Sequence, residues 1–153
     1  MIVTLKELPD ALKKGCRLLA LDLGEKTIGL ALADPGLTVA TPLETIRRTK
    51  FTKDAEALDK VIAEWNIGGL VMGLPVNMDG TEGPRCQSTR QFVRNLEHRG
   101  LTLPIAFWDE RLSTSAVERF LIQGADMNRK RRGEVVDKMA AAYILQGALE
   151  ALR

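Results

Sequence analysis

The sequence has one histidine and two cysteines among its 153 residues, and this scarcity limits the chemistry open to the chain. The histidine, His98, lies between charged neighbours, where we expect it to be solvated. A Ser-His-Asp triad is therefore not expected, because its general base is a histidine. Cys16 and Cys86 are too few for a disulfide framework and favour a reducing compartment.

Long apolar stretches and a strong charge of one sign are also missing. No stretch is long enough to span a membrane, and residues 1–16 have no apolar block like that of a signal peptide. Together with the cysteine content, this predicts a cytoplasmic protein without a membrane partner. The formal net charge of +2 is too small to indicate a nucleic-acid partner, so only local clusters of basic residues can do so.

Hydrophobic residues make up 45% of the sequence, which suits one soluble globular domain with a sizeable core. No internal repeat or low-complexity linker marks a boundary. We therefore predict a single domain over residues 1–153, with residues 1–16 as an N-terminal extension. A short amphipathic turn is expected around Leu5 to Leu12.

Apolar runs and amphipathic stretches alternate along the chain, which predicts an α/β fold. The predicted strands cover residues 18–23, 28–33, 39–46, 67–74 and 105–108. The predicted helices cover residues 52–65, 84–96, 115–124 (opened by Ser115 with Glu118 and closed by Gly124) and 134–152. The strands at 18, 67 and 105 should pair in parallel, with the hairpin after Gly24 as an antiparallel extension. The expected result is a mixed five-stranded sheet with helices on both faces, and Pro42 marks an edge or a bulge.

Acidic residues follow two of the three parallel strands, at the edge where sites form in such sheets. Asp22 lies near the end of an apolar strand, where an unpaired charge is costly to bury. Its carboxylate needs a metal, a cation or backbone N–H groups, unless it caps the hairpin turn. Asp109 and Glu110 end the strand at 105, and the Gly73-Leu-Pro-Val-Asn77 turn ends the strand at 67.

A further carboxylate lies in the last helix. Helical spacing puts Asp137 on the apolar face, so it should point at the sheet, although it could simply complement the helix dipole. Clustered carboxylates raise one another's pKa unless a cation neutralises them. With no histidine or cysteine nearby, oxygen ligands from Asp22, Glu110 and Asp137 favour Mg²⁺ or Mn²⁺. Two such ions would activate water and stabilise the leaving oxygen of a phosphodiester.

Basic residues gather in three segments that could hold the flanking nucleic-acid backbone, at 47–53, 85–94 and 129–132. For the first segment a solvated loop is the favoured interpretation. Asn128–Arg132 is predicted to be a basic loop that carries Arg129, Lys130, Arg131 and Arg132. The polar stretch Val76–Gln87 is longer than a connection needs, which favours a function. We expect Arg85 to contact phosphate from the helix that Pro84 opens.

Four segments of the sequence resemble motifs of the YqgF/RuvX family, which comprises Holliday junction resolvase-like proteins and pre-16S rRNA nucleases. The resemblance covers nearly everything from Leu18 to Leu152, and its second motif is long and specific. The motifs are Asp22–Gly29 (DLGEKTIG), Gly73–Arg85 (GLPVNMDGTEGPR), Trp108–Ser113 (WDERLS) and Val136–Ala141 (VDKMAA).

The resemblance implies a ribonuclease H-like fold in which Asp22, Glu110 and Asp137 are the catalytic, metal-binding acids. It also implies supporting roles in the site for Asn77, Asp79 and Arg111. The family usually has arginine just before the isoleucine of the first motif, where this chain has Thr27. Neighbouring Lys26 could supply the phosphate contact that the arginine would make.

The implied activity is that of a divalent-metal-dependent endonuclease in 5′-end processing of pre-16S rRNA, with Holliday junction resolution as the alternative. Paired cuts in a junction need a symmetric dimer. The apolar stripes on the predicted helices are narrow enough for one sheet to bury, so we expect a monomer or weak homodimer and favour RNA processing. Two other classes remain: a nucleic-acid- or ribosome-binding factor without catalysis, and an actin-like or sugar-kinase-like ATPase, which would need two such domains to clamp its nucleotide.

Overall fold

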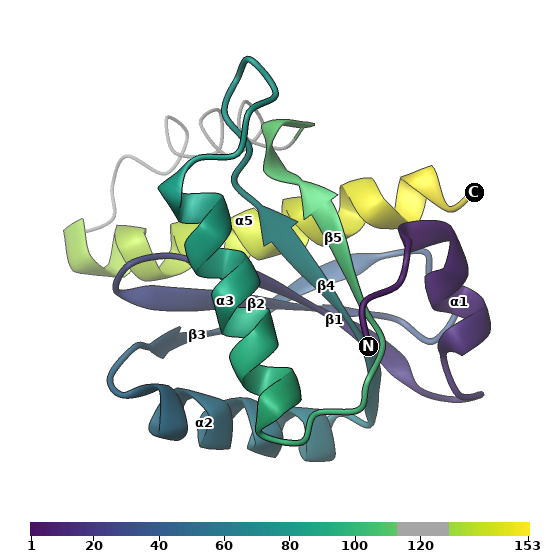
Figure 1. The fold of residues 1–153 in the computed structure, drawn as a ribbon. Coiled ribbons are helices and arrows are strands. Elements are labelled where there is room, and N and C mark those ends of the chain that lie inside the picture. The colour runs from purple at the N-terminus through teal and green to yellow at the C-terminus, as the bar shows by residue number, and fades with distance from the viewer. Residues whose placement is uncertain (113–128) are drawn as a thin grey trace.

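The structure is a computed structural model that describes residues 1–112 and 129–153, and its centre is one sheet (Figure 1). The strands are β1 (Arg17–Leu23), β2 (Thr27–Ala33), β3 (Ala40–Arg47), β4 (Ile67–Leu74) and β5 (Ile105–Asp109), in the order β3-β2-β1-β4-β5. Strands β1, β4 and β5 run parallel, and β2 and β3 extend the sheet antiparallel. The predicted mixed five-stranded sheet is confirmed.

Helices cover both faces of this sheet, as predicted. Helices α2 (Phe51–Glu64) and α3 (Pro84–His98) lie on one face, and α5 (Arg129–Ala151) lies on the other (Figure 1). Among the described helices, none is long and apolar enough to cross a membrane.

Strand alternation in β1 divides its side chains between the two faces. Leu19, Leu21 and Leu23 pack against α2 and α3, whereas Leu18 and Ala20 pack against α5. This period of two also places Asp22 on the α5 face, although the apolar residues around it would suit a hydrophobic side chain. The two faces predicted for this strand are confirmed.

Strand β3 lies at the edge of the sheet, and Pro42 pairs with Ala31 beside an irregularity in the β2–β3 register. Proline lacks the N–H that a central strand needs, so it is tolerated here. Pro42 was expected to mark an edge or a bulge, and the structure places it in an edge strand.

The first residues of the chain pack onto the sheet. The Val3 N–H donates to the Ile105 carbonyl at 2.8 Å, and Ile105 N–H donates to the Met1 carbonyl at 2.9 Å. A short 3-10 turn, η1 (Leu5–Glu7), leads into α1 (Leu8–Ala11), which confirms the predicted amphipathic turn. Leu8 is fully buried in the core on the α5 side of the sheet.

The last helix begins earlier than the sequence pattern predicts. We expected a basic loop over Asn128–Arg132 and a helix start near Glu134, but α5 begins at Arg129. That prediction was wrong because Lys and Arg are good helix formers, and the single glycine at 133 costs a helix only about 1 kcal/mol. The helix predicted from Ser115 to Gly124 lies outside the described residues.

Candidate active site

Two of the predicted acids, Asp22 and Glu110, meet across the strand that separates them. Asp22 is near the end of β1 and Glu110 directly follows β5, in the short 3-10 turn η2 (Glu110–Leu112), while β4 runs between these two strands. Glu110 donates a hydrogen bond to the Asp22 carboxylate. The side chain can cross β4 because the residue below it is Gly73, where an added Cβ would lie 2.5 Å from Glu110 Oε1.

The contact between these two carboxyl groups changes their acidity. Burial, the negative charge of Asp22 and the hydrogen bond between them together raise the pKa of Glu110 to about 9. Burial also raises the pKa of Asp22, and the charge of Asp137 raises it further, against the opposing effects of the Glu110 hydrogen bond and the charge of Arg85. The pair therefore shares one proton near neutral pH, as closely spaced carboxyl groups do.

Asp137 faces the sheet, as its position on the apolar side of the helix predicts. The Thr27 hydroxyl donates to Asp137 Oδ2 at 2.5 Å. Helix α5 can approach β2 this closely because Gly29 has no side chain: an added Cβ would overlap the Asp137 backbone carbonyl. Thr27 therefore orients one of the predicted acids, a role that the sequence did not suggest.

The donor atoms at this edge fit a hard divalent cation. Asp22, Glu110 and Asp137 all offer carboxylate oxygens, which Mg²⁺ and Mn²⁺ prefer. A cation would offset the burial and the charge repulsion that raise the pKa of Asp22 and of Glu110. Within the part of the chain that the structure describes, no three carboxylate, histidine or cysteine side chains form a ready-made metal site. Asp22 and Glu110 supply a pair, and Asp137 lies beside them, held by Thr27.

A pocket of about 320 Å³ opens beside Glu110. The loop between β4 and α3 forms one wall and projects beyond the sheet, at the top of Figure 1. Asn77, Arg85 and Arg111 contribute polar groups to its lining. We call this cavity the acid pocket; it is large enough for a phosphate group and the sugar attached to it.

Asn77 and Asp79 are tied into their own loop. Asn77 Nδ2 donates to Thr81 Oγ1 at 3.1 Å, and the Thr81 hydroxyl donates to Asp79 Oδ1 at 2.6 Å. Thr81 lowers the pKa of Asp79 through these hydrogen bonds. Asn77 reaches the pocket, whereas Asp79 lies exposed outside its lining, so the structure brings only one of the two to the acids.

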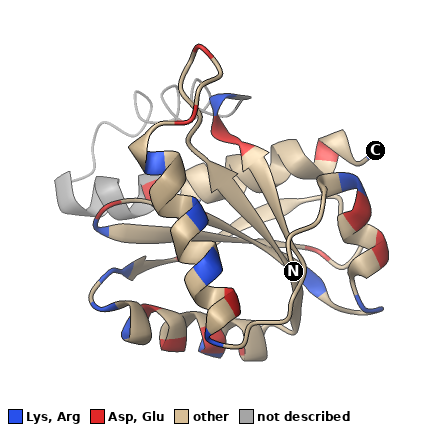
Figure 2. Ribbon diagram, in the orientation of Figure 1, with Lys and Arg blue, Asp and Glu red and all other residues tan. Residues whose placement is uncertain are grey.

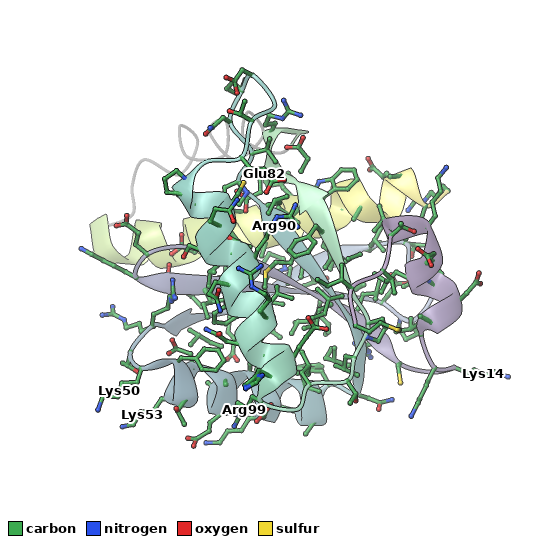
Figure 3. The ribbon with its side chains drawn as sticks, viewed as in Figure 1. Lys14, Lys50, Lys53, Glu82, Arg90 and Arg99 are labelled. Carbon is green, nitrogen blue, oxygen red and sulfur yellow. The ribbon has the colours of Figure 1, made fainter. Side chains whose placement is uncertain are left out.

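The arginines predicted to meet phosphate differ in their freedom to do so. Arg85 is exposed and lies close enough to lower the pKa of both Asp22 and Glu110. Arg90, by contrast, forms a two-pronged ion pair with Glu82 at 2.7 and 2.8 Å and stacks over the Phe107 ring (Figure 3).

Arg111 borders the acid pocket with its charge already paired. Its guanidinium donates to Asp109 Oδ2 at 2.6 Å and to the Met78 carbonyl at 3.3 Å. Figure 2 shows further basic residues along the side of α3 that faces the viewer. Lys26 is exposed beside Thr27, and the side chains of Arg129, Lys130, Arg131 and Arg132 lie outside the described residues.

Arg48 is not the solvated residue that its basic segment favours. It is half-buried, its Nη1 donates to the Gly24 carbonyl at 2.5 Å, and its guanidinium lies over the Phe92 ring. A backbone hydrogen bond of 2.8 Å from Gly24 to Thr27 closes the same hairpin turn. The turn is thus held without Asp22, whose carboxylate is directed at Glu110 instead.

The sheet order, the parallel central strands and the acids at their carboxyl ends define a ribonuclease H-like α/β protein. The family model described as "RuvX: Holliday junction resolvase" matches residues 16–151, and the chain belongs to this family.

Two relatives and one solved structure illustrate these similarities. A Rhodospirillum centenum protein named "Putative pre-16S rRNA nuclease" is 65% identical over 99% of this chain and 82% of its own length. A Paramagnetospirillum magneticum protein of the same name is 65% identical over 94% of this chain and 92% of its own length. The fold is similar to that of Thermus thermophilus RuvC in complex with Holliday junction substrate, with a TM-score of 0.54, 11% identity and coverage of 89% of this chain and 94% of RuvC.

Proposed function

We propose that this chain is a divalent-metal-dependent endonuclease that hydrolyses phosphodiester bonds in precursor 16S rRNA. The observation that carries the proposal is the contact between Asp22 and Glu110 beside an open pocket. Burying two carboxyl groups together costs stability, so an arrangement of this kind is typical of a functional site rather than of packing. The names of the relatives supply the proposed substrate.

The residues at this site would have separate roles in binding the metal and the phosphate. The carboxylate oxygens of Asp22, Glu110 and Asp137 would hold Mg²⁺ or Mn²⁺, with Thr27 fixing the orientation of Asp137. The bound ions would activate the attacking water and neutralise charge on the leaving oxygen. Arg85, which lines the pocket, would bind the phosphate and orient it toward the acids.

Holliday junction resolution is the second candidate, and the description of the matching family favours it. A resolvase must present two acid clusters in a symmetric dimer. We propose instead a monomer or weak homodimer, because the apolar faces of α2 and α3 are already packed in the core of the chain. The proposed compartment is the cytoplasm. One-sided binding of an RNA strand needs no second copy.

The test compares the cleavage of three substrates by one preparation in the presence of Mn²⁺: precursor 16S rRNA, single-stranded DNA and a four-way DNA junction. We expect cleavage of the RNA by the wild type and none by Asp22→Asn, whose side chain has nearly the same shape. Symmetric paired nicks in the junction by a stable dimer would favour resolution. Equal RNA cleavage by the folded Asp22→Asn variant would show that the Asp22 carboxylate is not needed for cleavage, which contradicts the proposed mechanism.

A further inference from the structure

A second pocket lies beside the acid pocket, on the other side of Arg85. It has a volume of about 220 Å³ and is lined by the β1–β2 turn, by Arg48 and by the first turns of α3. We call it the Arg48 pocket; its polar lining comes from Gly24, Glu25, Arg48, Arg85, Ser88 and Thr89. Arg48, Ser88 and Thr89 lie outside the family motifs, and of the lining residues the proposed chemistry uses only Arg85.

The two arginines of the Arg48 pocket suit an anion. The Gly24 carbonyl and the Phe92 ring hold the Arg48 guanidinium in place, so little conformational entropy is lost when it binds a ligand. The buried Asp54 carboxylate lies 4.0 Å from Arg48 Nε and offsets part of its charge, so Arg85 supplies the less compensated charge at this cavity. The Arg85 backbone carbonyl accepts a hydrogen bond from the Thr89 hydroxyl at 3.0 Å, but its guanidinium makes no hydrogen bond or ion pair with any residue that the structure describes. Guanidinium groups from two separate elements therefore meet at one cavity, and such groups bind phosphate well.

The N-terminus of α3 adds positive electrostatic potential to the Arg48 pocket. Gly83 provides no side-chain cap, and Pro84 occupies the first helical position. Positive potential at the start of a helix favours an anion. The hydroxyl of exposed Ser88 lines the same cavity and can donate a hydrogen bond.

Arg85 lines both pockets and so connects them. A nucleic-acid strand whose scissile phosphate lies by Glu110 would cross the start of α3 before reaching Arg48. We propose that the Arg48 pocket binds a backbone phosphate of the substrate strand, next to the phosphate at the acids. This inference rests on the proposed nuclease function and gives the strand its path across the surface.

The test uses two neighbouring positions of the same helix. Ser88→Glu places a carboxylate in the Arg48 pocket, whereas Gln87→Glu places the same charge on an exposed residue outside its lining. Both substitutions lie near the start of α3, where a negative charge suits the helix dipole, so both variants should fold. Glu25→Gln is the opposite change, because it removes a carboxylate that already lines the pocket.

Binding is measured with a labelled single-stranded RNA oligonucleotide in EDTA over a series of salt concentrations. We expect Ser88→Glu to weaken binding about tenfold and to flatten the salt dependence by about 0.7 units of slope, as expected for one lost phosphate contact on a single strand. Gln87→Glu should change the affinity less than threefold, and Glu25→Gln should tighten binding. With Mn²⁺, Ser88→Glu should raise KM and leave kcat unchanged, since the contact is remote from the reacting phosphate.

Equal weakening by Ser88→Glu and Gln87→Glu would overturn the inference, because only overall charge would then matter. Unchanged affinity of Glu25→Gln would overturn it as well. These comparisons concern binding, so they are separate from the nuclease proposal. A wild-type protein that binds the RNA with this pattern of variants but does not cleave it would refute the nuclease function and leave the phosphate pocket standing.

Discussion

Replacing Gly73 by alanine tests how the two acids are brought together. The added methyl carbon would lie 2.5 Å from Glu110 Oε1 and 2.7 Å from Ile144 Cδ1. Strand β4 is hydrogen-bonded on both sides, to β1 and β5, so its backbone cannot shift away. Both clashing atoms are ends of flexible side chains, and we expect the Glu110 carboxyl group to turn away from Asp22.

The expected cost in stability is modest. Overpacking a core by one methyl group typically costs about 1–3 kcal/mol, and separating two buried carboxyl groups offsets part of this. For a chain of this size, 1 kcal/mol corresponds to about 2–4 °C in Tm. We therefore expect Gly73→Ala to melt within about 8 °C of the wild type but to lose metal-dependent cleavage as fully as Glu110→Gln does.

Gly69 on the same strand provides the control. An added Cβ at Gly69 would lie 2.9 Å from Leu18 Cδ2 and 3.2 Å from Leu8 Cδ1, in the core and away from the acids. Gly69→Ala should therefore lose a similar amount of stability and keep its activity. Thermal unfolding and Mn²⁺-dependent RNA cleavage measure both effects, and full activity of Gly73→Ala would refute the role assigned to the glycine.

The remaining predictions concern Glu110, Thr27 and Arg85. The pKa of Glu110 rises from its ordinary 4.5 to about 9 on folding, so the folded state holds a proton that the unfolded state releases between these pH values. The stability of the wild type in EDTA should therefore fall as pH rises from about 5 to 9, and Glu110→Gln should lack this pH dependence. Curves of stability against pH that run parallel for the wild type and Glu110→Gln would contradict the raised pKa. Thr27→Val should weaken Mn²⁺ binding about 10–100-fold because it frees Asp137, and Thr27→Ser should restore the affinity. Calorimetry measures the Mn²⁺ affinity of each variant, and a Thr27→Val variant that binds like the wild type would exclude an orienting role for Thr27. Arg85→Ala should weaken RNA binding and flatten its salt dependence by about one unit of slope. An unchanged slope would show that Arg85 is an ordinary solvated residue that makes no phosphate contact.

The elements of the sheet could be predicted because their signals are local. Apolar runs located β1 and β4 to within a residue, and alternation along β1 placed Asp22 on the face opposite Leu19 and Leu21. Helical spacing likewise placed Asp137 toward the sheet. Each of these inferences needs only the geometry of one strand or one helix.

The details that complete the candidate site depend on contacts between distant segments. Thr27 and Asp137 are 110 residues apart in the sequence, and Gly73 matters only because Glu110 crosses β4 above it. Arg90 resembled Arg85 in the sequence but is occupied by Glu82, which only the fold brings beside it. Such pairings follow from tertiary packing, which the periodicity of one element does not encode.

The most direct test of the account is a Mn²⁺ titration of thermal stability in the wild type and Asp22→Asn. Because a ligand that binds only the folded state stabilises it, saturation to 100 times Kd should add about 2.7 kcal/mol to the wild type. In a chain of this size this corresponds to a rise in Tm of about 5–11 °C. We predict that rise for the wild type and little change for Asp22→Asn; an equal rise in both proteins would contradict a metal site built on this carboxylate.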